Sequence, residues 1–93
     1  MDYNIIYHPD VKKVDMPKID VRNKSMIKRA IEERLATSPE VYGKPLRRSL
    51  KGYWKLRVGD YRIVFKIAGH DLRILAIIDR KAVYQQSEKR IND

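Results

Sequence analysis

The chain has 93 residues, 43% of them hydrophobic and 35% charged, which is enough for one small domain with a heavily solvated surface and too little for two. Its 21 Lys and Arg residues and 12 Asp and Glu residues give a formal charge of +9, which predicts a polyanionic partner such as nucleic acid, an acidic protein or a membrane surface. The absence of cysteine excludes a disulfide framework, a thiolate zinc site and a cysteine nucleophile.

The N-terminal half of the chain predicts one strand followed by two helices. Residues 3–7 are β-branched and aromatic, which is typical of a strand. A short helix is expected over residues 10–14 and should end before Pro17, because proline lacks an N–H donor and clashes with the preceding turn. A longer helix is expected over residues 20–36, because apolar side chains recur at helical spacing from position 27 to position 35.

Two alternating segments in the second half predict a β-hairpin. A polar connector over residues 40–48 precedes them, and from Tyr53 the hydrophobic period changes to two. Segments 53–58 and 61–67 flank Gly59-Asp60, a dipeptide that fits a two-residue turn with glycine at a position of positive φ.

The next apolar segment predicts the centre of a sheet. Residues 72–78 are apolar on both alternations except for Arg73, as in a strand covered on both faces, and residues 81–93 predict a short helix or an irregular tail. The order of elements indicates a single α+β domain, in which an N-terminal strand and two helices pack on one face of a mostly antiparallel sheet that ends in a three-stranded meander. The longest apolar run, residues 74–78, is far shorter than the roughly 20 residues of a transmembrane helix, so we expect a cytosolic protein with no membrane partner.

The hairpin register places four cations on one face. If Gly59 and Asp60 form the turn, Arg57 faces Arg62 directly, and Lys55 lies diagonal to Arg62 on the same side. Opposed like charges destabilise a sheet, so this pairing needs an explanation. One reading is that the side chains spread into water or are neutralised by a nearby carboxylate. The other is a phosphate site, because arginine presents a planar fork to phosphate oxygens and lysine a point charge. The four cations are Lys55, Arg57, Arg62 and Lys66.

A second basic stretch leads into the same strand. Lys44, Arg47, Arg48 and Lys51 precede two aromatic residues, a mixture typical of surfaces that stack single-stranded RNA. Strand parity assigns Trp54 to the core and leaves Tyr53 as the stacking candidate. No cluster of His, Asp or Glu has metal-ligand spacing, and no glycine loop for phosphate is present, so no metal and no cofactor are expected.

Two motifs resemble a known family. The stretch Leu50–Phe65, LKGYWKLRVGDYRIVF, contains Leu, Gly, an aromatic and then a basic-Leu-Arg-Val-Gly-Asp-Tyr-Arg-hydrophobic run, and the later Asp79–Tyr84 contains an Arg…Val-Tyr element. Both are similar to motifs of the RelE/ParE toxins of bacterial toxin–antitoxin pairs. The resemblance covers most of the chain, is specific in its second half and favours the RelE-like branch.

The resemblance implies a ribosome-dependent endoribonuclease that cleaves mRNA in the ribosomal A site, with the ribose 2′-hydroxyl attacking the adjacent phosphate. By position, Lys55 matches a lysine on a strand that acts as a base or stabilises charge in the family. Arg62 matches the arginine that holds the phosphate. Arg80 matches an arginine proposed as acid or phosphate ligand, and Tyr84 matches a tyrosine that positions or stacks on the nucleotide. The expected RNA-binding residues are Arg47, Arg48, Lys51, Tyr53, Arg57 and Lys66.

The chain departs from the RelE pattern in two places. Tyr53 or Trp54 stands where RelE has a second lysine, and Lys51 is the nearest substitute. Strict alternation also places Arg80 on the face opposite Arg62, so a bend after Ile78 is needed to bring them together.

Alternative functions and partners follow from the same family. One alternative is a ParE-like DNA gyrase inhibitor without nuclease activity, and another is a catalytically inactive relative that only binds an antitoxin. The expected partners are an acidic cognate antitoxin, the ribosome and mRNA. The toxin alone is expected to be a monomer that forms a hetero-oligomer with its antitoxin, which electrostatic attraction should bind quickly.

Overall fold

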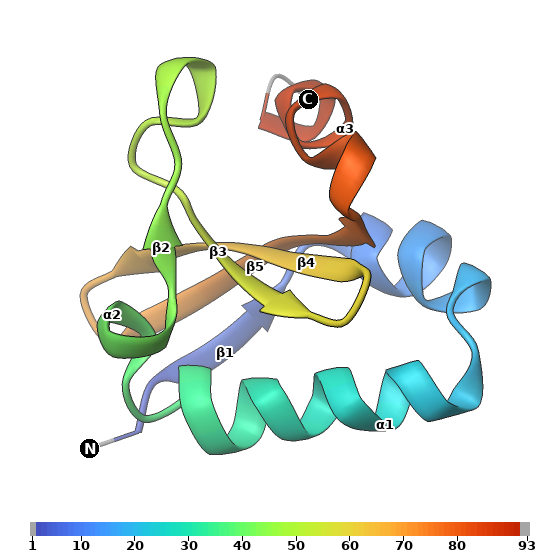
Figure 1. Cartoon of the computed structure of the whole chain (residues 1–93). Coiled ribbons are helices and arrows are strands. Elements are labelled where there is room, and N and C mark those ends of the chain that lie inside the picture. The colour runs from blue at the N-terminus through green and yellow to red at the C-terminus, as the bar shows by residue number, and fades with distance from the viewer. Residues whose placement is uncertain (1, 92–93) are drawn as a thin grey trace.

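The strand that is apolar on both alternations lies inside the sheet. In the computed structural model, which describes residues 2–91, five strands form one sheet in the order β1-β5-β4-β3-β2 (Figure 1). The strands are β1 (Asn4–Tyr7), β2 (Lys44–Pro45), β3 (Trp54–Val58), β4 (Tyr61–Ala68) and β5 (Asp71–Asp79). β1 runs parallel to β5, and the other neighbours are antiparallel. The predicted α+β fold and its β3–β5 meander are confirmed, whereas β2 lies in the segment expected to be a connector.

The long predicted helix is present in two parts. α1 (Val21–Ala30) continues directly into the π-helical turn η3 (Ile31–Leu35), and Asp20 caps α1 by accepting a hydrogen bond from the N–H of Asn23. The first predicted helix is present and ends at Asp15, before Pro17, as expected, although the chain stays helical beyond it. The chain passes from η1 (Val11–Asp15) into the 3-10 turn η2 (Met16–Lys18), where Pro17 occupies an early position that needs no N–H donor.

The remaining helical segments are short, and they include the predicted C-terminal helix. They are α2 (Pro39–Tyr42), η4 (Arg48–Leu50), η5 (Arg80–Ala82) and α3 (Val83–Ile91). No helix within residues 2–91 is long and apolar enough to span a membrane.

Apolar side chains form two cores, one on each face of the sheet. The larger core joins α1, η1 and η3 to one face through residues such as Ile27, Leu35 and Phe65, all 1% exposed or less. The smaller core lies on the opposite face, where Val83 of α3 and Leu50 of η4 pack on Val64. Figure 1 shows α1 below the sheet and α3 above it. Only the N-terminal helices therefore share one face, and α3 lies on the other.

A β-bulge in β5 changes which face its residues occupy. Phe65 pairs with Ile74 and Val64 pairs with Ala76, so Leu75 is an extra residue without a cross-strand partner. Leu75 and Ala76 consequently both point into the smaller core, whereas Ile74 and Ile77 belong to the larger one. After the bulge, even-numbered residues of β5 face the side opposite to the one that strict alternation assigns them.

Candidate nucleic-acid interface and active site

The predicted hairpin register is confirmed residue by residue. Val58 pairs with Tyr61 across the turn, and Arg57 pairs with Arg62. Gly59 has a φ of +60°, the conformation that a two-residue hairpin turn requires of its first residue. β2 adds one more cation to the row, because Lys44 pairs with Lys55. Two pairs of like charges therefore face each other on adjacent rungs of the sheet.

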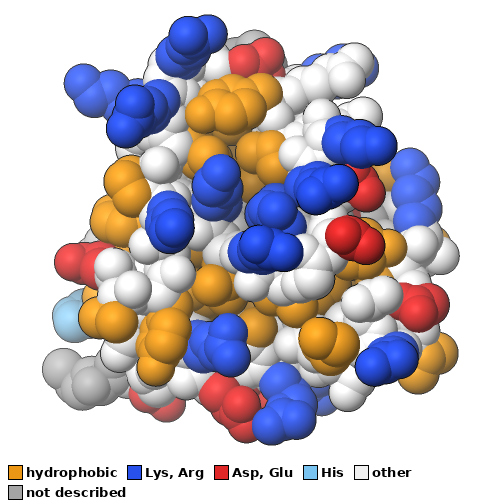
Figure 2. Space-filling view, in the orientation of Figure 1, with side chains coloured by type: hydrophobic (Ala, Val, Ile, Leu, Met, Phe, Trp, Pro, Cys, Tyr) orange, Lys and Arg blue, Asp and Glu red, His pale blue; other side chains and the backbone are white. Residues whose placement is uncertain are grey.

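These cations surround a hollow of about 240 Å³ on the surface. We call it the basic hollow, and it is lined by Tyr42, Lys44, Lys55, Leu56, Arg57 and Arg62. Figure 2 shows Lys and Arg side chains gathered over the face of the molecule on which β3 lies. Within residues 2–91, the only cations with a carboxylate oxygen within 4.0 Å are Arg29 and Arg90, so no carboxylate neutralises the hollow. Asp79, a candidate for that role, instead accepts a hydrogen bond from the N–H of Lys81 at 2.9 Å.

Arg62 is oriented by the turn of its own hairpin. Its Nη1 donates to the carbonyl oxygens of Gly59 and Tyr61, each at 3.0 Å. These bonds move the Arg62 guanidinium toward the turn, which offsets the repulsion expected between it and Arg57. They use one of its three nitrogens and leave Nε and Nη2 as donors, which suits the binding of an anion such as a phosphate.

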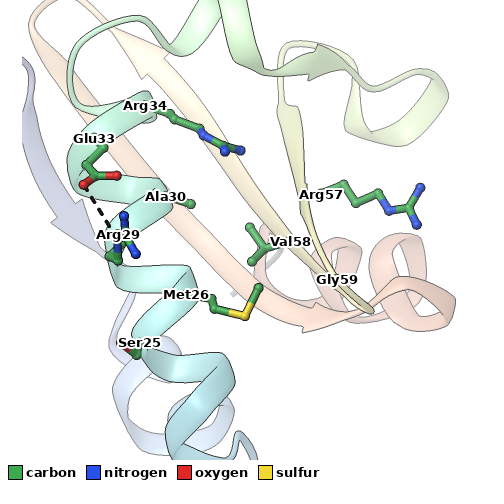
Figure 3. A pocket seen from close by; sticks show the side chains of 9 residues that line it. All are labelled: Ser25, Met26, Arg29, Ala30, Glu33, Arg34, Arg57, Val58 and Gly59. Atoms are coloured by element: carbon green, nitrogen blue, oxygen red, sulfur yellow. Dashed lines mark ion pairs between the residues drawn. The ribbon is translucent and has the colours of Figure 1, made fainter.

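Arg57 and Val58 leave β3 on opposite sides. Figure 3 shows Val58 directed toward α1 and Arg57 directed away from it. The groove between α1 and β3 is also basic, because Arg29 and Arg34 lie on its helical wall. Arg29 is paired there with Glu33 at 3.7 Å, as the dashed line in Figure 3 marks.

The backbone of Arg80 lies beside the turn of the β3–β4 hairpin, which also holds the side chain of Arg62. Ile78 pairs with Arg62 and packs in the smaller core, so the bulge places position 78 on the face of Arg62. Arg80 follows two residues later, and its N–H donates to the carbonyl of Asp60 at 3.1 Å. The bulge therefore removes the difference of face that strict alternation predicted for position 78, and the chain leaves the strand after Asp79, where η5 begins at Arg80. Arg80 is exposed and does not line the basic hollow.

Tyr84 lies in the first turn of α3, also outside the basic hollow. Its hydroxyl oxygen accepts a hydrogen bond from the N–H of Arg47 at 3.3 Å, which leaves its O–H free to donate. Its side chain is 40% exposed. The bond ties α3 to the arm, our name for residues 44–52, which Figure 1 shows rising from the sheet on the same side as α3.

The other predicted RNA-binding residues lie along the arm and the neighbouring strands. Arg47, Arg48 and Lys51 are exposed on the arm, outside the basic hollow. Tyr53 is half-buried against the smaller core, and the ammonium of Lys66 lies 5.5 Å from its ring centroid. Trp54 belongs to the larger core, as predicted, and stacks on Phe65 with ring centroids 6.5 Å apart.

Three residues that line the basic hollow were absent from the predicted site, and one of them is the apolar Leu56. Lys44 lies opposite Lys55 in the sheet. The sequence instead suggested Lys51 as the substitute for the second lysine of RelE. Tyr42 lines the hollow, and the guanidinium of Arg34 lies 5.8 Å from its ring centroid. Strand β2 brings Lys44 into place, and its two residues are too few to show any alternation.

Known proteins resemble this chain over most of its length. The family model of the ParE toxin of the type II toxin–antitoxin system parDE matches residues 5–84. The chain belongs to the RelE/ParE superfamily of toxins. A curated relative of this RelE/ParE-family toxin, Toxin RelE of Mycobacterium tuberculosis, is 40% identical over 58 residues, and the match spans 60% of each protein.

Solved structures of RelE proteins share the fold of this RelE/ParE-family toxin. The toxin–antitoxin complex RelBE2 of M. tuberculosis contains a chain with a TM-score of 0.79 and 27% identity, covering 86% of this toxin and 100% of that chain. A free-state structure of a mutant of the E. coli toxin RelE has a TM-score of 0.76 and 21% identity, covering 98% and 99% of the two chains. At that identity the second likeness shows the fold alone.

Proposed function

We propose that this toxin is a ribosome-dependent endoribonuclease that acts in the cytoplasm and cleaves mRNA in the ribosomal A site. The observation that carries the proposal is the basic hollow, where Lys44, Lys55, Arg57 and Arg62 meet without a carboxylate among residues 2–91. Such a site matches the charge of an RNA phosphate and the extra negative charge that develops on it during transfer. The similarity to Toxin RelE supports the same reading.

The proposed reaction needs a phosphate ligand, a base and an acid. The 2′-oxygen attacks the adjacent phosphorus, its proton passes to a base, the bond from phosphorus to the 5′-oxygen breaks, and an acid protonates that oxygen. We assign the phosphate to Arg62, whose guanidinium is held by the turn, and base or charge-stabilising work to Lys55. Arg80 is proposed as the acid or as a further phosphate ligand, and Tyr84 as the residue that positions the nucleotide or stacks on it. The products are a 2′,3′-cyclic phosphate and a free 5′-hydroxyl.

The remaining basic surface is proposed to bind RNA along its backbone. Tyr53, which is half-buried against the smaller core, is proposed to stack on a base. Phosphate contacts are proposed for the exposed cations around it, which are Arg47, Arg48, Lys51, Arg57 and Lys66.

An acidic antitoxin is the proposed protein partner. The toxin carries a formal charge of +9, and the related chain from M. tuberculosis was solved in a toxin–antitoxin complex. Charge attraction would make the association fast and sensitive to salt. We propose that an antitoxin segment covers or distorts the basic hollow. A complex in which Lys55, Arg62 and Arg80 remained open and undisturbed would contradict this.

The test is induction of the toxin without antitoxin, followed by mapping of new RNA ends. Ends confined to translated frames, at a fixed position within codons, are the expected result. Growth arrest with no new ends but with DNA breaks would favour gyrase inhibition, the alternative that the ParE family model suggests. Absence of arrest would leave a relative that only binds an antitoxin.

A further inference from the structure

A buried ion pair joins three segments that are far apart in the sequence. Arg90 of α3 donates to both carboxylate oxygens of Asp15 at the end of η1, through Nη1 at 2.7 Å and Nη2 at 2.6 Å. Both residues are almost fully buried, with 7% and 4% of their surfaces exposed. Asp10 lies 3.8 Å from the Nε of Arg90 and adds a second negative charge. The hydrogen bonds to Asp15 raise the pKa of Arg90 above its already high value, so the guanidinium is charged.

The same ion pair forms hydrogen bonds with backbone groups of β5 that lie beyond the end of the neighbouring strand β1. The last bond between the two strands runs from the N–H of His8 to the carbonyl of Ile74. The carbonyl of Leu75 then accepts a hydrogen bond from Arg90 Nη1 at 3.1 Å. The N–H of Ile77 donates to Asp15 Oδ2 at 2.8 Å. The ion pair therefore satisfies both sides of the β-bulge, whose backbone groups would otherwise be buried without partners.

Arg80 and Tyr84, two residues of the proposed site, depend on the bulge of β5 and on α3. The bulge sets the side of the sheet on which Ile78 lies, and Arg80 follows it. α3 carries Tyr84 in its first turn and Arg90 in its last, about 9 Å apart along the helix axis. Fixing Arg90 therefore fixes the direction of the helix that presents Tyr84.

We propose that Asp15 and Arg90 are positioning residues for RNA cleavage, which hold the bulge of β5 and the axis of α3 so that Arg80 and Tyr84 keep their places relative to Arg62. This inference rests on the proposed nuclease function. It assigns no contact with RNA to either residue, and both lie outside the basic hollow.

The test replaces both charges together with Asp15→Leu/Arg90→Met, because apolar replacement of a complete buried ion pair is often neutral or stabilising. The control is Arg29→Gln/Glu33→Gln, which removes an exposed ion pair on the long helix. Each full-length toxin is assayed in single turnover on ribosomes programmed with mRNA, and its fold is checked by urea unfolding. The Asp15→Leu/Arg90→Met toxin should show a rate at saturation that is about 10- to 100-fold lower, with a nearly unchanged half-saturating concentration. The control should keep the rate of the unmodified toxin.

Simple loss of folded protein would give a different result. It would raise the apparent half-saturating toxin concentration and leave the rate at saturation unchanged. If the double variant does not fold, the Arg90→Lys toxin is assayed in its place. Lysine keeps the positive charge but lacks the forked guanidinium, so a reduced rate at saturation is expected. A folded variant with the full rate overturns the inference while the nuclease function stands. If the unmodified toxin cuts no mRNA, the proposed nuclease function is wrong, and so is the positioning role that rests on it.

Discussion

Arg62 and Arg80 are both held by the turn of the β3–β4 hairpin. The Nη1 of Arg62 donates to the carbonyls of Gly59 and Tyr61, and the N–H of Arg80 donates to the carbonyl between them, that of Asp60. Three consecutive carbonyls thus fix one arginine through its side chain and the other through its backbone. The turn therefore fixes the position of Arg62, the proposed phosphate ligand, relative to the backbone of Arg80, the proposed acid or further phosphate ligand.

Replacement of the phosphate ligand should abolish toxicity. Arg62→Ala removes the only guanidinium that the turn orients, so we expect cleavage on programmed ribosomes to fall about 100- to 1,000-fold. Growth arrest on induction should disappear with it. Arg22→Ala, on the exposed side of α1, is the control and should remain toxic. Full toxicity of the Arg62→Ala protein would remove Arg62 from the proposed site.

Lys44, which belongs to the second basic stretch but not to the predicted site, should contribute to RNA binding. It pairs with Lys55 in the sheet and lines the basic hollow. Binding of a single-stranded oligoribonucleotide is measured at several salt concentrations. If Lys44 contacts a phosphate, the plot of log affinity against log salt concentration should be less steep for Lys44→Ala, by about one unit of slope. Lys12→Ala serves as the control, since Lys12 lies over Tyr7 and outside the hollow. Equal slopes for Lys44→Ala and the unmodified protein would exclude a phosphate contact by Lys44.

The parts of the site that the sequence predicted are those with a local signal. The period of two and the Gly59-Asp60 dipeptide specified the register that joins Arg57 to Arg62. The bulge had no such signal, because residues 72–78 are apolar on both alternations apart from Arg73 and a change of parity leaves no mark in the pattern. The Asp15–Arg90 pair spans 75 positions, and only the tertiary fold brings its two residues together.

Gly43 should be intolerant of any side chain, because it holds α2 and β2 close to the core. A Cβ at this position would lie 2.5 Å from Cζ of Phe65 and 2.9 Å from the carbonyl oxygen of Pro39. Gly43→Ala should therefore destabilise the protein by about 1–3 kcal/mol and reduce cleavage by displacing Lys44. Gly69→Ala is the matched control, since a Cβ there meets no atom within 4 Å and only its φ of +61° resists substitution. The control should lose some stability and retain the rate of cleavage.

Breaking the buried ion pair on one side should cost more stability than replacing both residues. Asp15→Ala leaves the charge of Arg90 buried without its main partner, for which we expect a loss of about 3–5 kcal/mol in the free energy of unfolding. The Asp15→Leu/Arg90→Met protein has no unpaired charge, but it leaves the N–H of Ile77 and the carbonyl of Leu75 without these partners, so it should recover only part of the loss. Urea unfolding followed by the fluorescence of Trp54, the single tryptophan, measures both values. A smaller loss for Asp15→Ala than for the double replacement would contradict this account of the pair.

Tyr7 should make the protein sensitive to alkaline pH. Burial raises the pKa of its hydroxyl above the usual value of about 10, and the negative charge of Glu32 raises it further. The folded protein therefore holds the Tyr7 proton more tightly than the unfolded chain does. Its contribution to stability is fully present below about pH 10 and is lost as the pH rises through the folded-state pKa.

Tyr7→Phe isolates this effect, because phenylalanine keeps the ring and has no proton to release. The free energy of unfolding of the unmodified protein should fall relative to that of the Tyr7→Phe protein as the pH rises above about 10. Glu32→Gln should narrow the difference without removing it, since burial is the larger cause of the shift. Parallel pH profiles for the Tyr7→Phe and unmodified proteins would show that the Tyr7 hydroxyl ionises as readily in the folded as in the unfolded chain.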